Sequence, residues 1–385
     1  MKKYFNVFKF ANQTIFSKFV RSGLMKSWEK HIKLFIPGPV EVYPDVLKAI
    51  SKPVIGHRGK PFEDLYADTI PKLKKVFYTN NDVFLSTSSG TGVWEACARN
   101  CIEKKALACV SGAFSENWYN VTLANGKPVD KIELEWGRAF KPDIIDEKLA
   151  TGEYDALLLV HNETSTGVTN PIYEIAKVMK KYPDVLFLVD AVSSLAGIKL
   201  EADKLGIDVC LASVQKAFAI PPGLAVFSVS KKALERAGKI KNRGYYFDFL
   251  MFKKYAEKNQ TPSTPAMPQI YGLNMQLDKI LAEGMEKRFE RHRQMAEYTR
   301  KWALGQGFEL FPEKGYESNT LTTINNNKGI IVADLIKKLN ERGMAIGNGY
   351  KKLKDITFRI AHMGDTQLDE IKELLEIIDE ILGGG

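Results

Sequence analysis

Short apolar runs that alternate with amphipathic helical segments constrain the fold of this chain more than any other feature. We expect strands at 83–86, 106–110, 156–160, 185–190, 208–213 and 224–229. Three segments between these strands show helical periodicity, at 92–103, 115–125 and 172–182. Continuous apolar strands joined by helices are typical of a mostly parallel sheet that is covered on both faces. The sequence therefore predicts an α/β fold with a mostly parallel sheet.

The chain divides into three parts by composition. Residues 1–24 are basic, contain no acidic residue and lack the apolar core of a secretory signal. They are interpreted as an organellar presequence, as a flexible or amphipathic arm, or, preferably, as sequence upstream of a second start at Met25. Residues 25–275 are expected to form the large sheet domain with an N-terminal arm. One long helix is expected over 269–304, and residues 276–385 are expected to form a smaller α+β domain.

Composition excludes several classes of protein. The chain has 385 residues, of which 45% are hydrophobic and 26% charged, so it can bury a substantial core. No apolar stretch approaches the roughly 18 residues of a membrane span. The net charge is +9, but lysines and arginines before residue 25 supply five of those charges, so nucleic-acid binding is not expected. Buried, reduced thiols are expected for all four cysteines, which indicates a cytoplasmic location: Cys97, Cys101, Cys109 and Cys210.

Two charged residues stand at the ends of predicted apolar strands. Asp190 ends the strand at 185–190, and Lys216 follows the strand at 208–213. Open α/β sheets bind their ligands at the carboxyl ends of the strands. Pyridoxal phosphate requires an amine for a Schiff base and a carboxylate that keeps its ring nitrogen protonated. Taken singly, Lys216 could instead pair with a carboxylate, and Asp190 could cap a helix.

The stretch Ser89-Gly90-Thr91 lies between a predicted strand and a predicted helix. Free N–H groups and the helix dipole make such a turn an anion site. Small polar residues at this position often serve only as helix caps. A phosphate-bearing cofactor would need one such site at the same sheet edge as Lys216 and Asp190.

Several short motifs follow one another in a fixed order between about residues 33 and 380. They are IPGP at 36–39, SGTG at 89–92, HNETSTGV at 161–168, DAVSS at 190–194, QK at 215–216, PPG at 221–223, TP at 264–265 and FRI at 358–360. Together they resemble the class V aminotransferases of fold type I, in the alanine/serine–glyoxylate or serine–pyruvate branch. The resemblance implies a pyridoxal 5'-phosphate enzyme whose large domain has a mostly parallel sheet and whose C-terminal domain is a smaller α+β unit.

The resemblance also implies a role for individual residues around the cofactor. Lys216 would form the Schiff base and later move the proton, and Asp190 would pair with the ring nitrogen. Val192 would press one face of the ring, and Phe114 would stack on the other. The phosphate and phenolic-oxygen contacts would come from Ser89, Gly90, Thr91, Gln215 and Thr164.

Substrate and subunit contacts follow from the same resemblance. Arg359 would bind the substrate carboxylate through two parallel hydrogen bonds. Thr264 would reach the phosphate in a neighbouring subunit, which implies a homodimer with a composite active site. Some relatives have a tyrosine where this chain has Thr261. Arg58, in a His57-Arg58 pair, would lie near the substrate.

The activity implied is ping-pong transamination from serine or alanine to glyoxylate or pyruvate. Phosphoserine aminotransferase activity is the alternative, because those enzymes carry a similar His-Arg pair. A cysteine desulfurase would need a reactive thiol in the carboxyl-terminal part, and no cysteine follows Cys210. The glycine spacing does not fit a dinucleotide oxidoreductase. An inactive relative and a basic nucleic-acid-binding protein are the non-enzyme alternatives. The aromatic run at 245–247 is a candidate for shaping the donor pocket.

Overall fold

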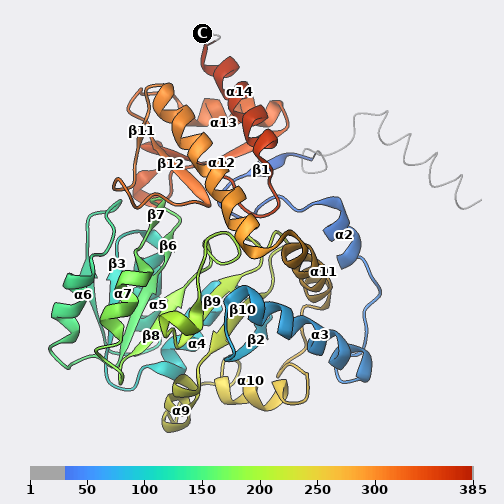
Figure 1. Cartoon of the computed structure of the whole chain (residues 1–385), viewed down its shortest axis with the longest axis vertical. Helices are drawn as coiled ribbons and strands as arrows, with labels where there is room; N and C mark the ends of the chain where they lie inside the picture. Colours follow the sequence, from blue (N-terminus) through green and yellow to red (C-terminus); the bar gives the residue numbers. More distant parts are fainter. Residues whose placement is uncertain (1–30, 384–385) are drawn as a thin grey trace, which may run out of the picture.

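A seven-stranded sheet forms the centre of the lower part of the molecule in Figure 1. The computed structural model describes residues 31–383, so the expectations for residues 1–24 fall outside it. The strand order is β2 (Asp82–Ser86), β10 (Ala225–Val229), β9 (Val209–Ser213), β8 (Leu186–Asp190), β5 (Ala156–Val160), β3 (Ala106–Val110) and β4 (Val129–Glu133). β10 runs antiparallel to both of its neighbours, β2 and β9, and the other strand pairs of this sheet are parallel. The prediction of a mostly parallel α/β sheet is therefore confirmed.

Helices cover both faces of this sheet, which explains why its central strands are apolar throughout. One face packs against α4 (Gly90–Cys101), α5 (Ala113–Ala124), α9 (Lys231–Lys239) and α10 (Phe249–Ala256). The other face packs against α2 (Pro44–Ile50), α3 (Lys60–Phe77), α6 (Pro142–Leu149), α7 (Ile172–Met179), α8 (Ala202–Leu205) and α11 (Met267–Glu283).

A second, five-stranded sheet lies in the upper part of Figure 1. Its strand order is β1 (Lys33–Phe35), β13 (Met344–Asn348), β14 (Thr357–Ala361), β12 (Leu321–Asn325) and β11 (Glu309–Leu310). A separate core joins it to α12 (Met285–Gly305), α13 (Val332–Glu341) and α14 (Leu368–Gly383). Residues 33–35 were expected to belong to the large domain, but they pair in parallel with β13 of this sheet.

The single helix expected over 269–304 is wrong, because the chain breaks at Gly284. The residue has φ +85° and ψ 132°, which end α11 and turn the chain into α12. Glycine adopts positive φ at little steric cost. Figure 1 shows α12 rising from this break to the second sheet, so the break redirects the chain between the two sheets.

The remaining elements are short. β6 (Asn162–Glu163) and β7 (Val168–Thr169) form a small antiparallel hairpin after β5, and a 3₁₀ turn spans Lys351–Leu353.

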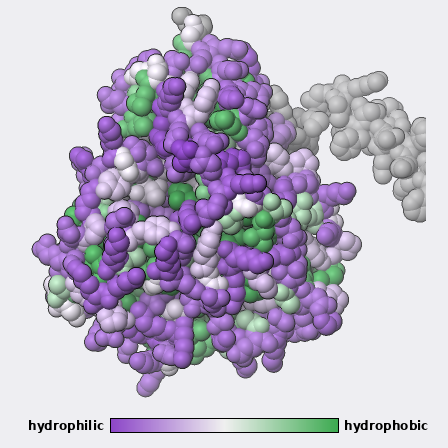
Figure 2. Space-filling model, in the orientation of Figure 1, coloured by the Kyte–Doolittle hydropathy of each residue, from purple (hydrophilic) through white to green (hydrophobic). Residues whose placement is uncertain are grey.

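All four cysteines are free and buried. The face in Figure 2 is largely hydrophilic, with apolar residues in small separate patches. Within residues 31–383, no helix is long and apolar enough to cross a membrane.

Candidate active site

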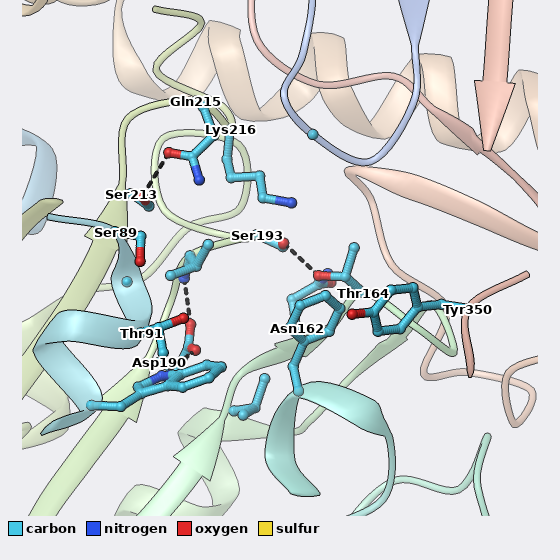
Figure 3. A pocket seen from close by; sticks show the side chains of 16 residues that line it. Ser89, Thr91, Asn162, Thr164, Asp190, Ser193, Ser213, Gln215, Lys216 and Tyr350 are labelled. Carbon is cyan, nitrogen blue, oxygen red and sulfur yellow. Dashed lines mark hydrogen bonds between the residues drawn. The ribbon is translucent and has the colours of Figure 1, made fainter. Parts of the chain in front are cut away.

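A cavity of about 300 Å³ opens at the carboxyl ends of the parallel strands. It brings together nine residues that the sequence analysis expected around the cofactor: Ser89, Gly90, Thr91, Phe114, Thr164, Asp190, Val192, Gln215 and Lys216. The other lining residues are Gly38, Trp94, Val160, Asn162, Ser193, Ser213 and Tyr350. Figure 3 shows Asp190 and Lys216 at the cavity; Asp190 ends β8, and Lys216 lies in the turn that follows the neighbouring strand β9.

Lys216 is a buried amine in the turn after β9. Its Nζ donates to the carbonyl oxygen of Pro37. Burial, and then the positive charge of Arg359, lowers the pKa of Lys216 to about 8. A Cβ atom on Gly38 would stand 2.5 Å from this Nζ, and Gly38 has φ +121°, so only glycine fits beside the amine. At pH 8, about half of this side chain is therefore a free amine that can act as a nucleophile.

Asp190 is the last residue of β8, and its buried carboxylate accepts hydrogen bonds from two donors. Trp94 Nε1 donates to Oδ2 and the backbone N–H of Val192 donates to Oδ1, each at 2.7 Å. Burial raises the pKa of Asp190 to about 7 in spite of both donors. A cationic N–H group placed in the cavity would offset that desolvation, which is what the ring nitrogen of pyridoxal phosphate provides.

Hydrogen-bond donors that could hold a ligand gather at the start of α4 and at Gln215. Helix α4 begins at Gly90, and no side chain caps its N-terminus. A Cβ atom on Gly90 would stand 2.7 Å from a methyl carbon of Val192, so glycine keeps this approach open. Ser213 Oγ donates to Gln215 Oε1 at 2.6 Å, which directs the other end of the amide, its NH₂ group, away from the serine (Figure 3). Backbone N–H groups, hydroxyls and an amide suit a phosphate group.

The position of Phe114 depends on Glu163, which is fully buried in the β6–β7 hairpin. The Glu163 carboxylate accepts hydrogen bonds from the backbone N–H groups of Phe114 at 3.2 Å and Ser115 at 2.9 Å. It also accepts from Ser165 Oγ at 2.6 Å. These bonds fix the first turn of α5. Sequence reasoning missed this role, although an acidic residue amid small polar residues at 161–168 was the available signal.

Arg359 lies on β14 of the second sheet and contacts Thr164, which lines the cavity. Its Nε donates to the carbonyl oxygen of Asn348 at 2.9 Å, and its Nη1 donates to that of Thr164 at 3.2 Å. Burial lowers the pKa of Arg359 to about 10, so the guanidinium stays charged at neutral pH. Three of its five N–H donors remain for a ligand. The Thr164 hydroxyl is already engaged, since it shares a 2.5 Å hydrogen bond with Ser193 Oγ.

Three predicted site residues lie outside the cavity lining: Arg359, Arg58 and Thr264. Arg58 donates to the carbonyl oxygens of Thr261 at 2.7 Å and Pro262 at 3.1 Å, and its guanidinium lies 5.0 Å from the Tyr255 ring centroid. Arg58 therefore holds the segment that leads to Thr264. Thr264 itself is exposed. Its contact with a neighbouring subunit stays a prediction, and the aromatic run at 245–247 also lies outside the cavity lining.

Comparisons with known proteins agree with this arrangement. The chain matches the family "Aminotransferase class-V" over residues 42–363. It is 42% identical over 354 residues to an uncharacterized aminotransferase of Methanocaldococcus jannaschii, covering 90% of this chain and 91% of the relative. It is 35% identical to a serine–glyoxylate aminotransferase of Methylorubrum extorquens, covering 86% of each chain. The crystal structure of an alanine–glyoxylate aminotransferase from Nostoc sp. matches with a TM-score of 0.87 and 28% identity, covering 91% of this chain and 95% of that one.

Proposed function

Because this chain belongs to the class V aminotransferases, we propose that it transfers the amino group of serine or alanine to glyoxylate or pyruvate. It is a pyridoxal-phosphate-dependent aminotransferase, so an amino acid and a 2-oxo acid are its substrates. The names of the M. extorquens and Nostoc relatives support glyoxylate as the acceptor, and serine and alanine as donors. The small cavity favours donors of that size.

The residues present fit the cofactor. When bound, pyridoxal phosphate supplies an electron-withdrawing ring that stabilises negative charge at the substrate Cα. We assign Asp190 to the ring nitrogen, Lys216 to the cofactor aldehyde, and the start of α4 with Gln215 to the phosphate. Phe114 and Val192 would flank the ring, and Thr164 would lie on its phenolic side. The carrying observation is that an unpaired buried carboxylate and a buried amine with a lowered pKa open into one cavity.

The protein side chains would carry the remaining steps. Arg359 binds the substrate carboxylate with its free N–H groups, and this grip fixes which bond of Cα faces Lys216. Lys216 then takes the proton from Cα as a free amine, which its lowered pKa permits. In the second half of the cycle, Lys216 returns a proton to the Cα of the oxo acid. Both half-reactions thus use one amine and one guanidinium.

A homodimer is part of this proposal. Thr264 is exposed, and Arg58 fixes the segment that precedes it, which suits a residue that completes the site of a second copy. Sedimentation of the holoenzyme should give a dimer. Mixing an inactive Lys216→Ala chain with an inactive Thr264→Ala chain should restore part of the activity if the sites are composite. The buried free thiols support the cytoplasm as the proposed location.

Half-reaction spectroscopy tests the proposed function. Each donor is added alone to the holoenzyme, and conversion of the bound cofactor to its amine form is followed by absorbance. Serine or alanine should convert it, and Lys216→Ala should not turn over. Conversion by O-phosphoserine alone, with loss of that conversion in Arg58→Ala, would establish the alternative donor. If no amino acid converts the cofactor, the chain is not a transaminase for the donors tested.

A further inference from the structure

Tyr350 is a lining residue to which neither the motifs nor the proposed mechanism assigns a role. It precedes the 3₁₀ turn between β13 and β14 and is 38% exposed at the cavity rim. Its ring is stacked on Phe114, with centroids 5.4 Å apart and planes at 8°. The Arg359 guanidinium lies 5.8 Å from the centroid of the same ring. Figure 3 shows Tyr350 on the side of the cavity where Thr164 lies.

The segment that carries this ring is fixed at both ends. Lys351 Nζ lies 2.8 Å from Asn117 Oδ1 and 3.2 Å from Glu116 Oε2, both on α5 of the large sheet's helical layer. On the other side, Gly349 donates its backbone N–H to the carbonyl oxygen of Thr357 at 2.8 Å. A Cβ atom at Gly349 would collide with the backbone of the same turn. The Tyr350 ring therefore has little freedom to leave the cavity rim.

We propose that the Tyr350 ring sets the upper size limit of the amino donor, excluding donors with side chains longer than about that of serine. This inference rests on the proposed function. The cavity of about 300 Å³ is at the small end of ligand pockets, and it must hold both the cofactor and the substrate. Arg359 fixes the substrate carboxylate, and the ring stands beside that guanidinium. Groups that extend beyond Cα on this side would meet a ring that is stacked on Phe114.

Steady-state kinetics with a graded donor series tests this inference. The holoenzyme, Tyr350→Phe and Tyr350→Ala are assayed with alanine, 2-aminobutyrate, norvaline and phenylalanine, with glyoxylate as acceptor. Tyr298→Ala is the matched control, because Tyr298 is 40% exposed on α12 and does not line the cavity. Tyr350→Ala should raise kcat/KM for norvaline relative to alanine at least about 10-fold, the discrimination that a methylene group supports in a closed pocket. Tyr350→Phe keeps the ring and should leave the ratio within twofold of that of the wild type.

A binding measurement separates this inference from the proposed function. Calorimetry of acetate, butyrate and phenylacetate binding to each holoenzyme needs no turnover. Tyr350→Ala should tighten phenylacetate relative to acetate at least about 10-fold, the same discrimination per methylene group. If the wild type transaminates no donor, the proposed function fails and the carboxylate series alone decides the role of Tyr350. An unchanged size preference in Tyr350→Ala, or an equal change in Tyr350→Phe or Tyr298→Ala, overturns the inference.

Discussion

Replacing Trp94 with phenylalanine should weaken cofactor binding in a strongly pH-dependent way. The indole N–H donates at 2.7 Å to Asp190, whose pKa burial already raises to about 7. An N–H donor stabilises only the ionised carboxylate, and a hydrogen bond to a charged group contributes about 1.5–3 kcal/mol. Since 1.36 kcal/mol corresponds to one pKa unit, Trp94→Phe should raise the pKa of Asp190 further, by about 1 to 2.

The cofactor affinity should follow that pKa. In the proposed complex, the protonated ring nitrogen pairs with an ionised Asp190. Below the pKa of Asp190, binding must therefore first remove the proton from the Asp190 carboxyl group of the free protein. At pH 6 the variant should bind pyridoxal phosphate about 10- to 150-fold more weakly than the wild type. Above about pH 9 both proteins start with an ionised Asp190, and the two dissociation constants should converge. Fluorescence titration of the apoproteins with cofactor at several pH values measures both limits.

Trp118→Phe is the control for the loss of an indole. Trp118 is 1% exposed, is stacked on Trp94 at 6.1 Å, and its Nε1 has no hydrogen-bond partner among residues 31–383. Its replacement removes a similar volume but no bond to Asp190, so cofactor affinity should stay within twofold of that of the wild type. The reasoning is refuted if Trp94→Phe binds as tightly as the wild type at pH 6, or if its defect persists unchanged at pH 9.

Two further predictions concern Lys216 and Glu163. The rate at which an aldehyde and borohydride label Lys216 in the apoprotein should rise with pH, with a midpoint at about pH 8. Arg359→Met should move this midpoint upward, because the variant loses a positive charge near the amine. Peptide mapping measures the rates, and a midpoint near pH 10 in the wild type would contradict the prediction. Glu163→Gln should lower the free energy of unfolding by about 1–3 kcal/mol in denaturant titrations, because the new NH₂ group would face backbone N–H donors. Glu309 is exposed, so the control Glu309→Gln should change this free energy by less than about 0.5 kcal/mol.

Residues at strand ends were predictable because their position depends only on strand direction. Asp190 and Lys216 follow apolar runs of the type that parallel sheets require, so the sheet itself brings them to one edge. Trp94 was not predictable in this way. Its contact with Asp190 joins residues 96 positions apart and depends on how α4 is rotated against the sheet. Periodicity shows that a helix face is buried, but not which indole meets which carboxylate.

The contribution of the second sheet was harder to predict. Arg359 was predicted from the family motif, whereas Tyr350 lies in a connection whose shape depends on Gly349 and on the contact of Lys351 with α5. The break at Gly284 was missed because one glycine inside a periodic stretch costs only about 1 kcal/mol and is often tolerated. The positive φ that makes it a break is set by the two cores that α11 and α12 must join.

The two buried charged groups of the site show what kind of ligand it was built for. If Lys216 and Asp190 were partners in a salt bridge, attraction would lower the pKa of the acid and raise that of the amine. Burial shifts both pKa values in the opposite direction. Asp190 accepts a hydrogen bond from Trp94, and Lys216 donates one to the carbonyl oxygen of Pro37. We propose that the ligand meets two requirements, a cationic N–H for Asp190 and an electrophilic carbon for Lys216. Within one small cavity, a protonated pyridine ring with an aldehyde meets both requirements.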